Sequence, residues 1–177
     1  GNNFFYQEQY SLSLEHFQKA LKLLKSNQNE NGIYRTLSAI SSVYEQMDDN
    51  ELALGYVLSA LKIAEKLNDQ NGIAWTLLNV GSIRHNLKDY KNALANLTKA
   101  NQISESLGDE MLRANVLESL GHLYKDLGQL PQAVACLNTS LQISLDNNHR
   151  SNLVGLYETF AKVYYKLNDF EQFLIRN

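Results

Sequence analysis

Three side chains of this sequence have the chemistry to share a metal ion: His85, His122 and Glu118, the last of which stands one helical turn before His122. Zinc accepts imidazole nitrogens and carboxylates, and a structural zinc site takes four ligands. Two histidines and one carboxylate from separate segments fall short of that set. We therefore expect no metal, and two solvated histidines able to act as a mild pH sensor.

Motifs for covalent or phosphate chemistry are missing from the sequence. Cys136, the single cysteine, has no histidine within a helical turn, so we expect a small packed thiol and not a nucleophile. There is no glycine-rich phosphate loop, Gly-x-Ser-x-Gly, His-Glu-x-x-His or paired-cysteine pattern. The sequence predicts a protein that is not an enzyme and that needs no cofactor.

The charges are balanced, with 16 Lys and Arg against 19 Asp and Glu and a net charge of -3. Because no basic stripe is present to neutralise phosphates, we expect no nucleic-acid partner. No run reaches the ~18 apolar residues that a membrane span needs, so membrane insertion is not expected. One cysteine and no visible targeting segment favour a cytoplasmic location.

The elements that must position these side chains follow from a repeat of 40 residues. Apolar and small residues recur at that step, as in the sets Ala20, Ala60, Ala100 and Ser140, and Leu37, Leu77, Leu117 and Tyr157. A period of this length indicates a stacked array and not one globular core. An array offers a long surface made of equivalent faces, so binding is the expected function.

Within each period, two apolar patterns with helical spacing are separated by short polar breaks. Most breaks pair a residue suited to a left-handed helix end with a residue able to cap the next helix, as in Asn68-Asp69 and Gly108-Asp109, and Lys88-Asp89 stands at an equivalent break. These breaks predict antiparallel helices of about 18 residues. The predicted ranges are 70–87, 90–107, 110–127 and 130–147, with a further break at Asn168-Asp169.

Two positions in these helices need a packing explanation. Gly81 and Gly121 lie mid-helix, where glycine costs ~1 kcal/mol relative to alanine. Because Ser41 and Ala161 share their register, we expect a small side chain to be required where two helices approach closely. Arg84 replaces the tyrosine of the other units and should either reach solvent or meet a carboxylate.

The segments 77–100 and 117–140 resemble the tetratricopeptide repeat. The first carries Leu77, Val80-Gly81, Tyr90, Ala93-Leu94, Leu97 and Ala100, and the second carries Leu117, Leu120-Gly121, Tyr124, Ala133, Leu137 and Ser140. The unit is similar to a longer-helix variant found in bacterial regulators and in kinesin light chain. The resemblance implies an all-α fold, a right-handed α-α superhelical solenoid of antiparallel helix pairs.

The register places one array over 1–177, with complete units at 30–67, 70–107 and 110–147 and partial units at 1–27 and 150–177. Partial end units leave apolar faces without a neighbour. We expect Phe4, Phe5, Phe170 and Phe173 to be exposed, and self-association through the truncated ends is possible.

The resemblance also implies that first helices line a concave groove. Residues outside the packing register are then the expected ligand-binding set: Arg35, Trp75, Leu78, Asn79, Ser82, His85, Asn115, Glu118, His122, Lys125, Lys162 and Tyr165. Mixed charge with a few aromatics suits an extended peptide or a helix. Ser38 and Ser42 stand where chaperone-binding members begin their carboxylate clamp, so a free C-terminal carboxylate is not expected.

Two residues of this set carry the sharpest expectations. Trp75 is a candidate binding hot spot, and packing against a neighbouring loop is the equally weighted alternative. Asn79 resembles the asparagine with which related repeats hold a peptide backbone, whereas an ordinary solvated amide is its alternative. The expected function is a non-catalytic protein- or peptide-binding scaffold. The alternative is a sensory or regulatory segment of a larger bacterial signalling protein, such as a histidine kinase, nucleotide cyclase or transcription regulator.

Overall fold

The computed structural model describes the backbone of residues 2–148 and 153–176, and the side chains of residues 9–148 and 153–168. Within these residues the chain forms eight α-helices and no strand. The expected all-α class is confirmed. The chain divides into two compact units, Gly1–Asp89 and Tyr90–Asn177. The boundary falls at the Lys88-Asp89 turn, inside the predicted repeat 70–107, and each unit is described below by itself.

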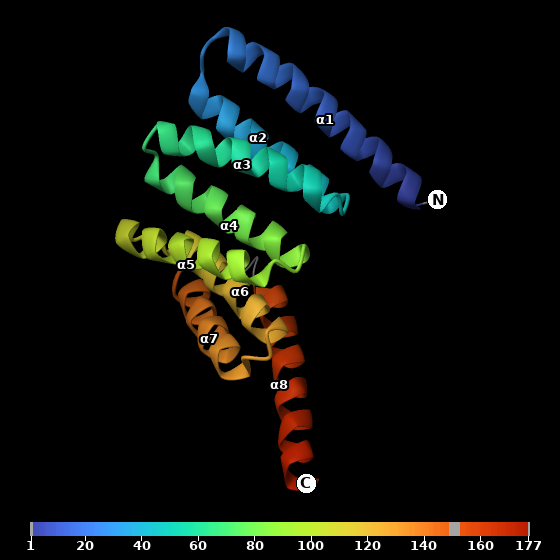
Figure 1. Cartoon of the computed structure of the whole chain (residues 1–177), viewed down its shortest axis with the longest axis vertical. Coiled ribbons are helices and arrows are strands. Elements are labelled where there is room, and N and C mark those ends of the chain that lie inside the picture. Colours follow the sequence, from blue (N-terminus) through green and yellow to red (C-terminus); the bar gives the residue numbers. More distant parts are fainter. Residues whose placement is uncertain (1, 149–152, 177) are drawn as a thin grey trace. The chain divides into compact units, whose positions relative to one another are not determined.

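The first unit holds four helices: α1 (Asn2–Ser26), α2 (Glu30–Gln46), α3 (Asn50–Lys66) and α4 (Gln70–Asn86). Figure 1 shows them side by side, each joined to the next by a tight turn and running antiparallel to it. The α3–α4 core contains Ala53, Val57, Val80 and Ile83. On the α2–α3 side, Tyr44 stacks on Tyr56 with ring centroids 5.3 Å apart.

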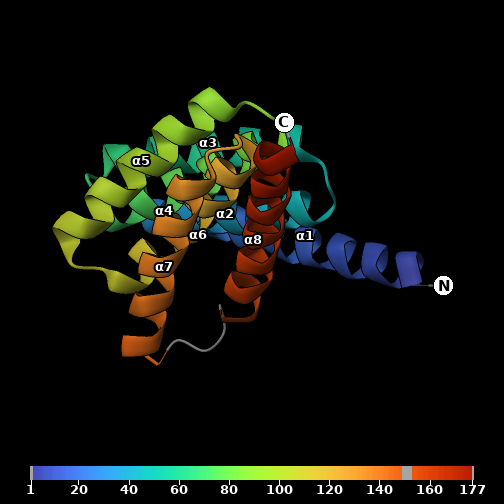
Figure 2. The ribbon, with the colours of Figure 1, turned by 90° about the horizontal axis from the view of Figure 1, so that it is seen from below.

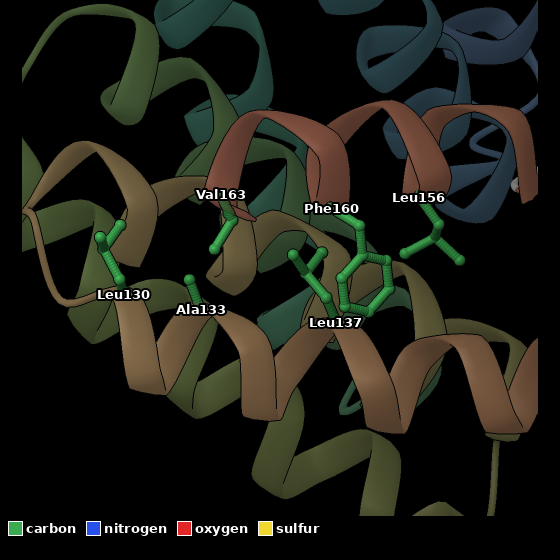
Figure 3. Packing of buried hydrophobic residues seen from close by; sticks show 6 residues of the cluster. All are labelled: Leu130, Ala133, Leu137, Leu156, Phe160 and Val163. Carbon is green, nitrogen blue, oxygen red and sulfur yellow. The ribbon is translucent and has the colours of Figure 1, made fainter. Parts of the chain in front are cut away.

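The second unit contains α5 (Tyr90–Leu107), α6 (Glu110–Asp126), α7 (Leu130–Asp146) and α8 (Leu153–Arg176). Consecutive helices pack together, and α8 also contacts α6, as Figure 2 shows. Figure 3 shows Leu156, Phe160 and Val163 of α8 pointing toward the buried side chains of α7. Those α7 side chains are Leu130, Ala133 and Leu137.

The turns use the chemistry that the sequence predicted. Seven helix ends carry a left-handed residue at the first break position: Gln28, Asp48, Asn68, Lys88, Gly108, Gly128 and Asn148. The next residue caps the following helix in several of them, since Asp49 accepts a hydrogen bond from the Leu52 amide and Asp109 from the Leu112 amide. Gln129 makes no side-chain cap, and Pro131 starts that helix instead.

Small residues sit where helices approach closely, as the register indicated. A Cβ added at Gly121 would lie 2.7 Å from Cγ of Leu137 on α7, which is closer than packed atoms come. At the equivalent position of the first unit, the Ser41 hydroxyl donates a 2.8 Å hydrogen bond to the Ala53 carbonyl of α3. The contact at Gly121 leaves no room for a Cβ, and the contact at Ser41 accommodates a small side chain that bonds the facing helix.

Arg84 meets a carboxylate, as expected for a charged residue in an apolar register. Its guanidinium lies 3.6 Å from Oδ2 of Asp89, and the side chain is 23% exposed. The ion pair and the partial exposure together avoid an unpaired buried charge.

The predicted break at Asn168-Asp169 is wrong, because α8 continues from Leu153 to Arg176. An Asn-Asp pair lowers helix propensity only moderately, so it does not by itself end a helix. Continuing the helix instead adds one backbone hydrogen bond per residue. The side chains of Phe4, Phe5, Phe170 and Phe173 lie outside the described residues.

Candidate functional site

A pocket opens in the first unit between the first helices of two successive predicted repeats, α2 and α4. Its volume is about 330 Å³. It is lined by Tyr34, Arg35, Ser38, Asn71, Gly72, Trp75, Thr76 and Asn79. Three of the residues expected to bind a ligand, Arg35, Trp75 and Asn79, therefore lie together.

Helical spacing explains how α2 and α4 present these side chains. Arg35 and Ser38 are three residues apart on α2, and Trp75 and Asn79 are four apart on α4, so each pair occupies one helix face. Trp75 and Asn79 are both half-buried. The pocket wall is thus part aromatic surface and part amide.

One buried polar group of the pocket has hydrogen-bonding capacity to spare. The Ser38 hydroxyl oxygen is buried and has no partner among the described residues. A buried polar atom left in this state costs about 1–3 kcal/mol unless water or a ligand satisfies it. Thr76 differs, because its hydroxyl faces the backbone carbonyls of Gly72 and Ile73 at 2.8 and 2.9 Å. Ser38 is therefore the hydroxyl available to a bound group.

A series of hydrogen bonds connects two pocket-lining residues, Tyr34 and Arg35, to Asp69 at the start of α4. The Tyr34 hydroxyl donates to Oδ2 of Asp69 at 2.6 Å, and Nε of Arg35 donates to the Tyr34 oxygen at 3.5 Å. The Arg35 guanidinium also lies 6.0 Å from the centroid of the Tyr34 ring. Asp69 is itself anchored, because its other oxygen accepts from the Gly72 amide at 2.9 Å and caps α4.

The pKa directions agree with this arrangement. The Gly72 amide and then the Tyr34 hydroxyl lower the pKa of Asp69 below its ordinary value of 3.8. Burial, followed by the hydrogen bond to Asp69, raises the pKa of Tyr34. The hydrogen bond to Tyr34 raises the pKa of Arg35. At neutral pH, Asp69 is therefore an anion, Tyr34 is a neutral phenol and Arg35 is an exposed cation.

The other predicted residues of the first unit lie apart from the pocket lining. Leu78 is buried, with 6% of its surface exposed, so it does not face a ligand as expected. The physical reason is that burying a leucine gains about 1.5–3 kcal/mol, and α4 is covered on most of its circumference. Ser82 and His85 are half-buried.

In the second unit, two predicted residues meet at the contact of α6 with α8. Nε2 of His122 is 3.1 Å from the hydroxyl of Thr159, which is also 2.9 Å from the Gly155 carbonyl. Glu118 lies against α8 as well, since a Cβ at Gly155 would be 3.2 Å from its carboxylate. Burial raises the pKa of Glu118.

The remaining predicted residues of this unit are spread along α6 and α8. Asn115 is half-buried, and the ammonium of Lys125 lies 3.3 Å from Asp126. Lys162 and Tyr165 are exposed on α8. A shallow hollow of about 690 Å³ borders them, lined in the described part of the chain by α8 residues alone.

Sequence reasoning missed four residues of the pocket: Tyr34, Asn71, Gly72 and Thr76. One signal was present at Tyr34, because the residues one and two periods later are Ala74 and Ala114. A tyrosine at a position that holds alanine in the next two repeats indicates that the packing differs locally around Tyr34. Gly72 accommodates it, since a Cβ there would lie 2.7 Å from the Tyr34 hydroxyl.

Among the described residues, no group of three or more His, Cys, Asp or Glu side chains converges on a point that could hold a metal. Burial raises the pKa of Cys136, which disfavours its thiolate. In that same part of the chain, no helix combines the length and apolarity needed to cross a membrane.

Comparison with solved structures shows the fold. BtubC from P. vanneervenii has a TM-score of 0.74 at 22% identity, over 96% of this chain and 69% of that one. Aspartyl phosphate phosphatase F from Bacillus subtilis has a TM-score of 0.80 at 16% identity, over 96% and 46%. The Rap conjugation gene regulator of plasmid pLS20, in complex with the Phr* peptide, has a TM-score of 0.67 at 17% identity, over 97% and 52%. The chain thus spans about half the length of the phosphatase and of the pLS20 regulator, and 69% of the length of BtubC.

No curated protein matches the sequence. The tetratricopeptide repeat family matches residues 72–146, a range that includes α4 to α7. That segment has the two-helix units, the left-handed turns and the small residue at the close helix approach that the 40-residue register predicted. The resemblance to the tetratricopeptide repeat that the sequence predicted is therefore confirmed for residues 72–146.

Proposed function

We propose that the protein is a non-catalytic peptide- or protein-binding scaffold, and that the pocket between α2 and α4 is its ligand site. The single observation that carries the proposal is the convergence of Trp75, Asn79 and Ser38 on one pocket. The three combine a half-buried aromatic side chain with hydrogen-bonding groups that the described chain leaves unused.

An extended peptide offers hydrogen-bonding partners for the polar side chains of this pocket. Its backbone presents one N–H and one carbonyl per residue, and the Asn79 amide can donate to one and accept from the other. The Ser38 hydroxyl supplies a further donor and acceptor. A side chain of the peptide would cover the indole of Trp75, which is the kind of contact that dominates binding energy in many interfaces.

The comparisons support this proposal through the fold. The pLS20 regulator was solved in complex with the Phr* peptide, and a Rap protein with a TM-score of 0.77 was solved with Competence and Sporulation Factor. Those ligands belong to those proteins. They demonstrate that helical arrays of this fold hold such partners, and we extend only the class of ligand to this chain.

Selection of peptides from a displayed random library tests the proposal. Peptides enriched on the wild-type protein should lose binding to Trp75→Ala, while circular dichroism and the melting temperature stay unchanged. Tyr157→Ala is the matched control, because it removes an exposed aromatic from α8. Equal binding of the selected peptides to Trp75→Ala and wild type would reject this site.

A second candidate function is a regulatory segment that controls an output domain of a larger protein. It is favoured by the solved relatives that are about twice as long as this chain, one of which is named a conjugation gene regulator. A gene product with a kinase, cyclase or DNA-binding domain whose activity changes on peptide binding would support it. Identical output activity with and without the selected peptide would contradict it.

A further inference from the structure

We propose that the α2–α4 pocket selects peptides carrying an acidic side chain, and that this carboxylate binds Arg35. The inference rests on the proposed function, because it names the class of ligand for that same site. It starts from the charges around the pocket. Among the lining residues, Arg35 carries the one formal charge, and the others are aromatic, amide, hydroxyl or glycine.

Arg35 is held toward the pocket by contacts that a freely moving surface arginine lacks. Its Nε donates to the Tyr34 oxygen, and Tyr34 is buried with 5% of its surface exposed. Tyr34 is in turn hydrogen-bonded to Asp69, the cap of α4. The residue that accepts the Arg35 hydrogen bond is therefore itself held in place. The terminal nitrogens of the guanidinium remain for a ligand, and such charge-assisted hydrogen bonds to a carboxylate are about twice as strong as neutral ones.

The nearby Asp69 does not cancel this preference. One of its oxygens accepts from the Gly72 amide and the other from the Tyr34 hydroxyl. Its negative charge also faces the N-terminus of α4, where the helix dipole offsets it. The Asp69 carboxylate therefore points to the N-terminus of α4, and Asp69 does not line the pocket.

The charges along α2 set the direction in which the peptide lies. Glu45 stands ten positions after Arg35 on the same helix, about 15 Å further along its axis. It accepts a hydrogen bond from Asn86 of α4 at 3.2 Å, so it faces the same neighbouring helix as the pocket does. A peptide carboxylate is repelled at that end and attracted at the Arg35 end.

Trp75 makes the test direct, because it is the single tryptophan of the chain and it lines the pocket. Its fluorescence is titrated with three blocked tetrapeptides, acetylated and amidated, of sequence Ala-Leu-X-Ala with X as Glu, Gln or Lys. Blocking the ends removes terminal charges, so a terminal carboxylate cannot mimic the side chain. We expect the Glu peptide to bind at least five times more tightly than the Gln peptide, and the Lys peptide to bind most weakly.

Variants of Arg35 identify the charge responsible. Arg35→Gln should abolish the preference for Glu over Gln, and Arg35→Lys should keep part of it. Lys62→Gln is the matched control, since it removes an exposed positive charge from α3 of the same unit and should leave the preference intact. The preference should also shrink between 50 mM and 500 mM NaCl, because an exposed ion pair is screened.

Three results would overturn the inference: equal affinity for the Glu and Gln peptides, a preference that survives in Arg35→Gln, or no response to any of the three. The proposed function is judged separately by the library selection. Selected peptides that need Trp75 but carry no acidic residue would retain the peptide site and reject its preference for acids.

Discussion

The Tyr34 hydroxyl lies 2.6 Å from Oδ2 of Asp69, and this hydrogen bond connects two successive first helices of the array. Asp69 also caps α4 through the Gly72 amide. The Asp69 carboxylate thus caps α4 and also holds Tyr34, whose hydroxyl accepts a hydrogen bond from Arg35. The geometry of the candidate pocket therefore depends on Asp69, a residue outside the pocket lining.

Replacing Tyr34 by phenylalanine tests that dependence. A hydrogen bond to a charged group contributes about 1.5–3 kcal/mol, so Tyr34→Phe should lower the melting temperature by about 3–6 °C at pH 7. The pKa of Asp69 is depressed, so its stabilisation is present above its ordinary value of 3.8 and is lost as the pH falls through the lower folded value. The difference between the two proteins should therefore shrink in acid. Equal melting at pH 7 would contradict the role given to this bond.

Gly121 and Leu137 should be energetically coupled. Gly121→Ala gains helix propensity but pushes a methyl group into Leu137, so we expect a net loss of about 1–2 kcal/mol. Leu137→Val in the same protein makes room, and the double variant should be at least ~1 kcal/mol more stable than the sum of the single changes predicts. Urea unfolding measures all four proteins.

Gly55→Ala is the control for this cycle. Gly55 lies in α3, and nothing lies within 4 Å of a Cβ added there. The substitution should therefore stabilise the protein by up to ~1 kcal/mol. For the cycle itself, the changes in unfolding free energy caused by Gly121→Ala and Leu137→Val are compared with that of the double variant. If they simply add, the contact between the two residues is not tight.

The elements of the fold were largely predictable because they depend on local signals. The predicted helix 70–87 is observed as Gln70–Asn86, and 110–127 as Glu110–Asp126. Each end is set by a left-handed residue and a cap, and both can be recognised within a few residues of sequence. The predicted break at Asn168 was wrong because an Asn-Asp pair lowers helix propensity only moderately and does not by itself end a helix.

The site was predictable only in part. Helical spacing predicted Arg35, Trp75 and Asn79 as groove-facing residues from the register alone, and in the structure all three line one pocket. It could not show that Leu78 is buried, since burial depends on the surrounding helices. The contact between Tyr34 and Asp69 joins residues 35 positions apart, and no local pattern specifies it.

Glu118 should make stability depend on pH in the opposite sense to Asp69. Burial raises its folded pKa above the ordinary value of 4.5, so its contribution favours the folded state in acid and is lost as the pH rises through that folded pKa. Glu118→Gln removes the cost of burying the charge. We expect it to raise the melting temperature by about 1–2 °C at pH 7 and to give no gain below pH 4.5. A lower melting temperature at pH 7 would mean that the carboxylate is stabilising.

Lys88 adopts a left-handed conformation with φ of 61°, which costs a side chain with a Cβ about 1–2 kcal/mol. Lys88→Gly should stabilise the protein by about 0.5–1 kcal/mol, because relief of strain exceeds the entropy that glycine loses. Gly128, with φ of 74° and open space around its Cα, provides the reverse test. Gly128→Ala should destabilise by about 1 kcal/mol in the same thermal melts.

The pocket between α2 and α4 is the proposed peptide site, and Asn79 is its most direct probe. Calorimetry with a selected peptide compares wild type, Asn79→Ala and Asn138→Ala, the last removing an exposed amide from α7. We predict at least a tenfold higher Kd for Asn79→Ala, which corresponds to about 1.4 kcal/mol, with an unchanged melting temperature. Asn138→Ala should bind like wild type. An unchanged Kd in Asn79→Ala would contradict a peptide site at this pocket.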